Sequence, residues 1–480
     1  MPIRTLAAAP MAFFLMISGI VAQERFRRTP PPPEPLPSLR LPNIEHATLS
    51  NGLRVAVVFR EGLPLISLQL VVFSGENASP PDLPGTATAA ARMFDRSTLR
   101  RSAADIERLI DAMGGTLSAT VQQELTIISL TFLEEHLDDA LLLVSERLLQ
   151  PVFSEPDWIE VRRDLSYSLQ RQEDDPAYIS RRLLLQRLYH GSSVHTPLLG
   201  SWDFRAVRAR NIADFADRHY RPNNVLVILA GNVSFRTATR KISHYLNTWT
   251  PGPLPAAASP LPEPNAALRI CFVDMPRATE ATICLGNIIP PISGPEYFPL
   301  LVFNQVLGGT PHSRLFLNLR ESKAYAYYAF SENMFLGSHG VFLVRARVKP
   351  EAAAEAVTEI LKEIRRATSE RILPAEIEQA KSHLIGHFPL SLESLEQLAL
   401  RVAAVQAYRL GSRHWDRYLE NIMLVSAETV HATAKKLSLN TPLVVVAGDR
   451  SLLLEHLRRF ERIEVYDKRG ELQYTLVKEK

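Results

Sequence analysis

Cysteine is nearly absent from this sequence: among 480 residues, only Cys271 and Cys284 occur. Without a second pair of cysteines, these two do not predict a structural zinc site. They lie symmetrically about Arg277 and Ala278, so they could oppose one another in a hairpin and form a disulfide. Two buried thiols on strands are an equally good interpretation, and the sequence leaves both open.

An excess of charge of one sign is also missing. The chain carries 54 Lys and Arg residues against 51 Asp and Glu residues, which gives a net charge of +3. No long basic run and no alternation of basic and aromatic residues occurs, which argues against a nucleic-acid partner. The composition, with 46% hydrophobic and 22% charged residues, is that of a globular protein. The length suggests two or three domains.

Long hydrophobic runs are confined to the N-terminus, where Arg4 precedes an apolar stretch from Leu6 to Val21. A charged start, an apolar core and small residues at the exit are typical of a secretory signal. The stretch is shorter than the roughly 20 residues that a membrane span needs. We therefore interpret residues 1–22 as a signal peptide cleaved after Ala22. We expect an exported, periplasmic protein with no stable membrane span after cleavage.

Proline, by contrast, is abundant, and two clusters of it divide the chain. Residues 23–45 contain the run T-P-P-P-P-E-P-L-P and predict an extended tether. Residues 251–266 contain the run P-G-P-L-P-A-A-A-S-P-L-P-E-P and predict an interdomain linker. The remaining parts, residues 46–250 and residues 267–480, are each long enough to form a domain.

These two parts end alike. Residues 224–232 read N-V-L-V-I-L-A-G-N and residues 441–449 read T-P-L-V-V-V-A-G-D, and each is an apolar strand pattern after a long helical region. The similarity predicts duplication of one domain. Strand patterns beside long helix pairs predict an α+β fold. The clearest elements are strands at 53–59, 65–73 and 126–132 and helices at 102–113, which begins with an S-x-x-D cap, and at 391–410.

Several short motifs follow one another in a characteristic order. They are L-S-N-G-L-R-V at 49–55, V-F-S-G at 72–75, Y-R-P-N-N at 220–224, L-G-G-T-P-H-S-R-L-F at 307–316 and L-R-E-S-K-A-Y-A-Y at 319–327. Over residues 45–450 the chain resembles the M16 (insulinase/pitrilysin-type) zinc peptidases. The resemblance implies two homologous domains with the mitochondrial processing peptidase-like metallohydrolase fold. Each domain would be an antiparallel-rich sheet packed with helices.

The same resemblance indicates that the zinc-binding residues of the family are missing from this chain. M16 peptidases carry two zinc ligands and a general base in an H-x-x-E-H motif, which aligns here with T-A-A-A-R. The two histidine positions are then Thr88 and Arg92, and the glutamate position is Ala91. A further glutamate ligand, expected before an E-D-x-P segment, falls on Ser168. We therefore expect no metal and no other cofactor in this chain, and no autonomous hydrolysis of peptides.

The second part keeps a different piece of the family's site. In the family, an arginine and a tyrosine of the L-R-E-x-x-x-x-A-Y segment reach the zinc site and stabilise the oxyanion. The match implies these roles for Arg320 and Tyr327, and both side chains suit a place where negative charge develops. Tyr325 and Tyr328 lie close enough to leave the register of the tyrosine open. The resemblance also implies substrate binding by a glycine-rich loop, at Gly308, Gly309 and Ser313.

One histidine pair imitates a metal motif. His383 and His387 have the i, i+4 spacing of a zinc pair. Gly386 stands where a glutamate would be needed, and Pro389 follows at the expected end of the helix. Because no third ligand is evident, we interpret the pair as structural or exposed histidines. A cryptic metal site is the alternative.

Taken together, the sequence predicts a pseudoenzyme: the non-catalytic subunit of a heterodimeric M16 zinc metallopeptidase. A zinc-bearing M16 partner would carry the H-x-x-E-H motif. This chain would supply Arg320, Tyr327 and a chamber wall for an unfolded peptide, which would bind partly by pairing with a sheet edge. The alternative is a peptide-binding or scaffold protein with the same fold and no role in catalysis.

Overall fold

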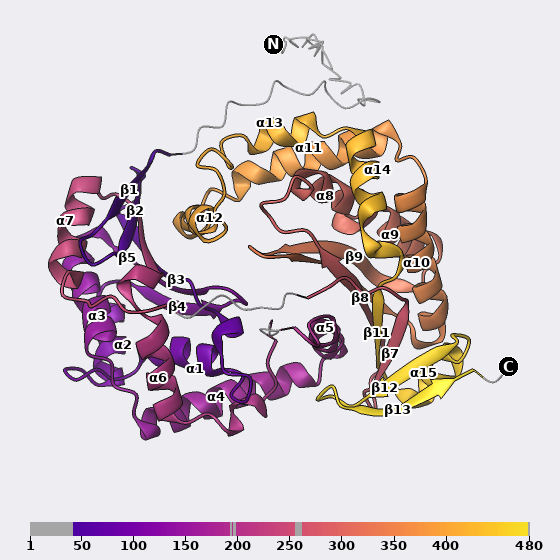
Figure 1. The fold of residues 1–480 in the computed structure, drawn as a ribbon, viewed down its shortest axis with the longest axis horizontal. Coiled ribbons are helices and arrows are strands. Elements are labelled where there is room, and N and C mark those ends of the chain that lie inside the picture. Colours follow the sequence, from indigo (N-terminus) through magenta and orange to yellow (C-terminus); the bar gives the residue numbers. More distant parts are fainter. Residues whose placement is uncertain (1–41, 193, 195–197, 255–261, 479–480) are drawn as a thin grey trace, which may run out of the picture. The chain divides into compact units, whose positions relative to one another are not determined.

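The structure is a computed structural model, and it describes residues 42–478 apart from residues 193, 195–197 and 255–261. The predicted signal peptide (1–22) and most of the predicted tether (23–45) lie outside the described residues, as does part of the predicted linker (251–266). Two sheets, each covered by helices, make up the described part (Figure 1). The α+β fold predicted from the sequence is therefore confirmed.

The first sheet has six strands. In chain order they are β1 (Ile44–Thr48), β2 (Arg54–Phe59), β3 (Leu65–Val72), β4 (Thr116–Val121), β5 (Thr126–Leu133) and β6 (Val225–Gly231). Their order in the sheet is β1-β2-β6-β3-β5-β4, and neighbours are antiparallel except β2 and β6. All of β6 is buried at the centre, whereas β4 alternates exposed and half-buried residues as an edge strand does.

The second sheet repeats this plan. Its strands are β7 (Arg269–Asp274), β8 (Ala281–Ile289), β9 (Ala326–Phe335), β10 (Gly340–Val348), β11 (Leu443–Gly448), β12 (Arg462–Tyr466) and β13 (Leu472–Val477). The run β7-β11-β8-β10-β9 has the order and directions of β2-β6-β3-β5-β4. The two strands that end in A-G, β6 and β11, hold equivalent central places, which confirms the predicted duplication.

Among the described residues, seven α-helices belong to the first half. They are α1 (Thr86–Arg92), α2 (Ala103–Ala112), α3 (Leu137–Leu149), α4 (Glu155–Glu173), α5 (Pro176–Leu188), α6 (Ala209–His219) and α7 (Phe235–Leu246). Helix α2 begins at the predicted place because Ser102 and Asp105 form a capping box. It ends before Gly114, whose φ of +61° favours glycine.

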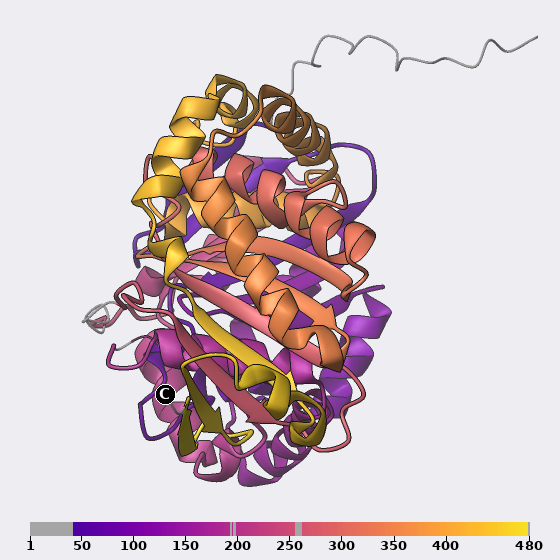
Figure 2. The same cartoon turned by 90° about the vertical axis from the view of Figure 1, so that its right-hand side faces the viewer.

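Eight α-helices of the described residues belong to the second half, and Figure 2 shows the long helix α10 lying across the strands of its sheet. They are α8 (Tyr297–Asn304), α9 (Arg314–Phe316), α10 (Ala353–Ser369), α11 (Pro374–Leu390), α12 (Leu395–Ala407), α13 (Tyr418–Leu424), α14 (Ala427–Lys436) and α15 (Arg450–Leu457). The helix predicted at 391–410 starts later, because the Ser394 hydroxyl accepts the Gln397 N–H and caps α12. Two π-helical turns, η6 (Gln305–Gly309) and η7 (Leu317–Ser322), flank α9.

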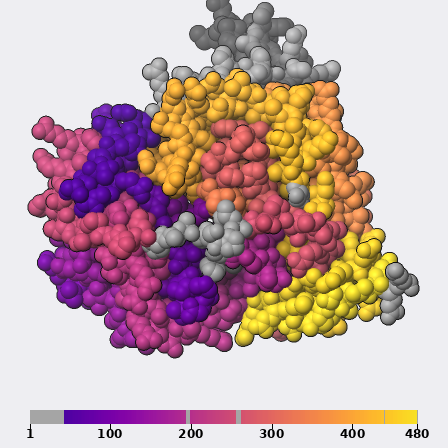
Figure 3. Space-filling model, in the orientation of Figure 1, coloured from indigo at the N-terminus to yellow at the C-terminus, as the bar shows by residue number. Residues whose placement is uncertain are grey.

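Each half also provides one helix that packs on the other half's sheet. Helix α5 packs on β8 and β11, and its apolar face is part of the core of the second sheet (Figure 1). Helix α12 packs on the equivalent strands β3 and β6 of the first sheet. Polar contacts support it, since the Gln69 side chain donates to the Glu396 carbonyl (3.1 Å) and Arg60 donates to the Glu393 carbonyl (2.7 Å). In Figure 3 the orange surface of this segment borders the indigo surface of the first strands.

The two cysteines do not face one another across a hairpin, so of the two alternatives the disulfide is wrong and the pair of buried thiols is confirmed. Strand β11 lies between β7 and β8, and both Cys271 and Cys284 are paired with its residue Val445. Two strand spacings separate them by about 9–10 Å, which is beyond the reach of a disulfide. Both are free, buried thiols, and burial raises the pKa of each to about 12.

Candidate functional site

Helix α1 carries the three positions that align with the zinc motif. It starts at Gly85, which has a φ of +85°, and it is only seven residues long. The Thr88 hydroxyl donates a hydrogen bond to a carboxylate inside the protein, and Ala91 is only 1% exposed. Arg92 ends the helix with its side chain exposed to solvent. A cation at this end of a helix is favoured by the helix dipole.

The carboxylate that Thr88 contacts belongs to Glu76, which is buried and was not singled out by the sequence. One oxygen of Glu76 accepts the Gly85 N–H at 2.5 Å, and the other accepts the Thr88 hydroxyl at 3.0 Å. Burial raises the pKa of Glu76 to about 7, although hydrogen bonds from Gly85, Ser79 and Thr88 act in the opposite direction. Glu76 therefore caps the first turn of α1 and ties the start of this helix to the segment that precedes it.

The fourth position, Ser168, lies exposed on α4, a helix that contacts α1. The four residues do not fit a zinc ion, because zinc takes His, Cys, Asp or Glu ligands. Alanine has no donor atom, and the guanidinium of Arg92 is a permanent cation. Between residues 42 and 478, leaving aside the gaps, no group of three or more His, Cys, Asp or Glu side chains could hold a metal ion.

Arg320, the arginine for which the family resemblance predicts a role, lies on a π-helical turn, a conformation that is frequent at functional sites. Arg320 is on η7, and its side chain is 51% exposed. Its guanidinium lies over the ring of Phe316, 4.9 Å from the centroid. It forms an ion pair with the adjacent Glu321 at 3.8 Å, and both partners are too exposed for that pair to hold it firmly. The aromatic ring is therefore the main support of the charged head.

Tyr327 lies on the edge strand β9, at an irregularity in the sheet. Arg347 pairs with Tyr328, but Val348 pairs with Ala326, so Tyr327 is an extra residue in β9. Such bulges re-aim side chains and are common beside active sites. Tyr327 is 54% exposed. The structure records no direct contact between Tyr327 and Arg320, although each is open to solvent.

The glycine-rich segment forms the other π-helical turn. Gly308 and Gly309 end η6, and Ser313 is the residue before α9. Gly308 backs onto β9 so closely that a Cβ there would lie 2.5 Å from the Ser331 nitrogen. Gly308 is buried and Ser313 is 2% exposed, so both lie against the protein interior. Their assignment to substrate binding stays a prediction.

The histidine pair on α11 lies away from both of these segments in the sequence, and both side chains are exposed. The rings of His383 and His387 are stacked with centroids 6.0 Å apart. Desolvation, and then the proximity of His387, lower the pKa of His383. The side chains of Gln305 and Arg401 line the same small cavity, and the fixed charge of Arg401 disfavours a cation there.

A second buried polar cluster lies where β3 and α6 end and β6 begins. The Ser74 hydroxyl is 2.8 Å from Nδ1 of His219, and the Asn224 amide donates to the same hydroxyl. Burial lowers the pKa of His219 to about 4, so the ring is neutral near pH 7. Both side chains are less than a tenth exposed. The pair is therefore a satisfied core contact rather than a nucleophile and its base.

Comparison with known families agrees with this geometry. The family model described as Insulinase (Peptidase family M16) matches residues 54–201, and the one described as Peptidase M16 inactive domain matches residues 206–384. Together they cover more than half of the chain. The protein belongs to peptidase family M16, and its second half is of the type described as inactive.

Relatives and solved structures are similar over most of the chain. Uncharacterized zinc protease YmxG of Bacillus subtilis is 23% identical over 398 residues, which are 82% of this chain and 95% of that protein. The peptidase M16 inactive domain from Pseudomonas fluorescens has a TM-score of 0.79 at 19% identity and covers 85% of this chain and 98% of its own. The periplasmic protease PqqL of Escherichia coli has a TM-score of 0.71 at 18% identity, over 87% of this chain and 46% of its own. These structural likenesses support the fold.

Proposed function

We propose that this chain is the non-catalytic subunit of a two-chain M16 zinc metallopeptidase. The observation that carries the proposal is the contrast between the two halves. The positions that would bind zinc hold residues that cannot ligate it, whereas Arg320 and Tyr327 are present and are 51% and 54% exposed. A group that must reach a site on another chain has to be exposed in this way.

In this proposal the partner is an M16 chain with an intact H-x-x-E-H motif, and it brings the zinc ion. This chain contributes hydrogen-bond donors. Arg320 offers a guanidinium and Tyr327 a hydroxyl to the carbonyl oxygen of an unfolded peptide, where negative charge develops during hydrolysis. The edge strands β4 and β9 offer unpaired backbone groups to the same peptide.

Export to the periplasm is part of the same proposal. The sequence pattern of residues 1–22 supports a cleaved signal peptide, and the similar protease PqqL is described as periplasmic. None of the helices that the structure describes is both long and apolar enough to cross a membrane. The partner would have to reach the same compartment.

Kinetics of the reconstituted pair test the assignment of Arg320 and Tyr327. We expect Arg320→Ala to lower kcat about 100-fold and Tyr327→Phe about tenfold, because each removes a donor to the oxyanion. The matched control is Arg365→Ala, which removes an exposed arginine of α10. Cleavage at the wild-type rate by assembled pairs carrying either variant would refute the proposal. It would favour a peptide-binding or scaffold protein without a catalytic role.

A further inference from the structure

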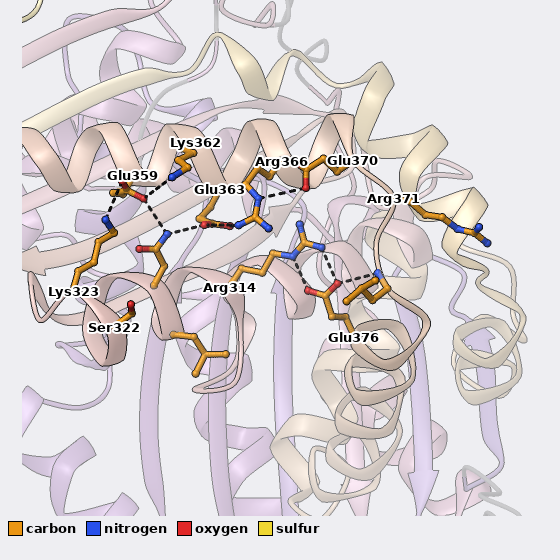
Figure 4. A pocket seen from close by; sticks show the side chains of 13 residues that line it. Arg314, Ser322, Lys323, Glu359, Lys362, Glu363, Arg366, Glu370, Arg371 and Glu376 are labelled. Carbon is orange, nitrogen blue, oxygen red and sulfur yellow. Dashed lines mark hydrogen bonds and ion pairs between the residues drawn. The ribbon is translucent and has the colours of Figure 1, made fainter.

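A polar pocket of about 550 Å³ lies behind the turn that carries Arg320, between η7, α9, α10 and the start of α11. Figure 4 shows side chains of α10 facing those of η7 across this pocket. Its central charges are paired with one another: Arg314 with Glu376 at 2.6 Å, and Arg366 with Glu363 at 3.0 Å. A ligand would have to separate these pairs. The pocket is therefore better explained as a joint between helices than as a binding site.

The centre of this joint is Asn318, a residue of η7. Its amide donates to Oε2 of Glu359 (3.1 Å) and to Oε1 of Glu363 (2.7 Å). Lys323 binds the other oxygen of Glu359 at 3.2 Å. Burial alone would raise the pKa of Glu359, but the bonds from Asn318 and Lys323 lower it overall, so the carboxylate is charged. Hydrogen bonds to a charged acceptor are the stronger kind.

Asn318 and Lys323 lie on either side of Arg320 in the sequence. The Lys323 N–H donates to the Asn318 carbonyl at 3.0 Å, and this bond closes a wide turn with Arg320 inside it. The next residue, Ala324, has a φ of +53°, which is unfavourable for a residue with a side chain. A π-helical turn followed by a left-handed residue needs support from outside the segment. Here the support comes from α10 through Glu359 and Glu363.

We propose that Asn318 and Lys323, held by Glu359 and Glu363, are positioning residues that set the direction in which Arg320 is presented. The hydrogen bonds and the ion pair to α10 hold η7 and the residue after it, and the Phe316 ring supports the Arg320 guanidinium. No contact with substrate is assigned to Asn318, Lys323, Glu359 or Glu363. The inference rests on the proposed function of Arg320.

A double-mutant cycle on the full-length chain, paired with its zinc-bearing partner, tests this. We expect Asn318→Ala to lower kcat about tenfold with KM changed less than twofold, because a small misplacement of a catalytic group is costly. In the Arg320→Ala background, Asn318→Ala should cause no further loss. Glu370→Gln is the control, since Glu370 pairs with Arg366 at the same pocket but does not touch η7.

Three outcomes would overturn the inference. An unchanged kcat in Asn318→Ala, with Arg320→Ala still slow, overturns the positioning role and leaves the proposed function standing. An equal loss in both backgrounds shows a structural effect unrelated to Arg320. A normal rate in Arg320→Ala itself overturns the proposed function and the inference with it. Lys323→Met replaces Asn318→Ala if the latter fails to fold, and the same pattern is expected of it.

Discussion

Among single residues, Glu76 shows how α1, the helix that aligns with the zinc motif, is held in place. Its carboxylate is 1% exposed and caps α1 through Gly85 and Thr88. Its pKa in the folded protein is raised from 4.5 to about 7, mainly by burial. Between these two values the folded state binds more protons than the unfolded state, so the free energy of unfolding falls as the pH rises.

Replacing Glu76 by glutamine should remove this pH dependence. Relative to wild type, we expect the free energy of unfolding of Glu76→Gln to rise by roughly 3 kcal/mol between pH 4.5 and pH 8, from the size of the pKa shift. His219 and His339, whose pKa values burial lowers to about 4, act in the opposite direction in both proteins. The difference between variant and wild type, measured by urea unfolding at several pH values, isolates Glu76. A difference independent of pH would contradict the expectation.

At the scale of elements, the two π-helical turns coincide with the two segments for which the sequence motifs predict a functional role. The η6 turn brings its glycines against β9, and a Cβ on Gly308 would lie 2.5 Å from the backbone nitrogen of Ser331. Backbone cannot move aside as the end of a flexible side chain can. The glycine at 308 is therefore required by close packing.

Gly308→Ala should accordingly lower the free energy of unfolding by about 2–3 kcal/mol, as overpacking does. Gly386→Ala is the matched control, because no atom lies within 4 Å of a Cβ at that helical position. We expect Gly386→Ala to raise stability by about 1 kcal/mol through helix propensity. Chemical denaturation of the two variants measures both effects. Equal and small changes would mean that the approach of η6 to β9 is not tight.

Local patterns predicted many elements correctly, and their limits are physical. The helix at 103–112 follows from its own cap and stripe, and the strand at 65–72 from its own apolar run. Which strands become neighbours depends on residues far away, so the insertion of β11 between Cys271 and Cys284 was not predictable from their spacing. The hydrogen-bond partners of η7, Glu359 and Glu363, lie more than 40 residues further along the chain than Asn318, so no local pattern reveals them.

For the whole molecule, the duplication was predictable because two A-G strands close the two halves. The exchange of α5 and α12 between the sheets was not, since no local pattern tells a helix which sheet it will cover. The same contrast holds for the site. The family motifs predict roles for Arg320 and Tyr327 and single out the four positions that align with a zinc site, whereas a lone glutamate such as Glu76 has no pattern to reveal it. Features that depend on contacts between distant parts of the chain, such as the buried Glu76 and the exchange of α5 and α12, cannot be predicted from motifs.

The proposed division of labour between two chains is tested most directly by one comparison of rates. Cleavage of an unfolded peptide is measured for the purified chain, for an H-x-x-E-H-bearing M16 partner, and for the two together. The predicted result is no zinc-dependent cleavage by this chain alone and a rate for the pair at least 100-fold above that of the partner alone, which lacks the oxyanion donors. Zinc-dependent cleavage by this chain alone, or a partner whose rate does not change on addition of this chain, would contradict the account.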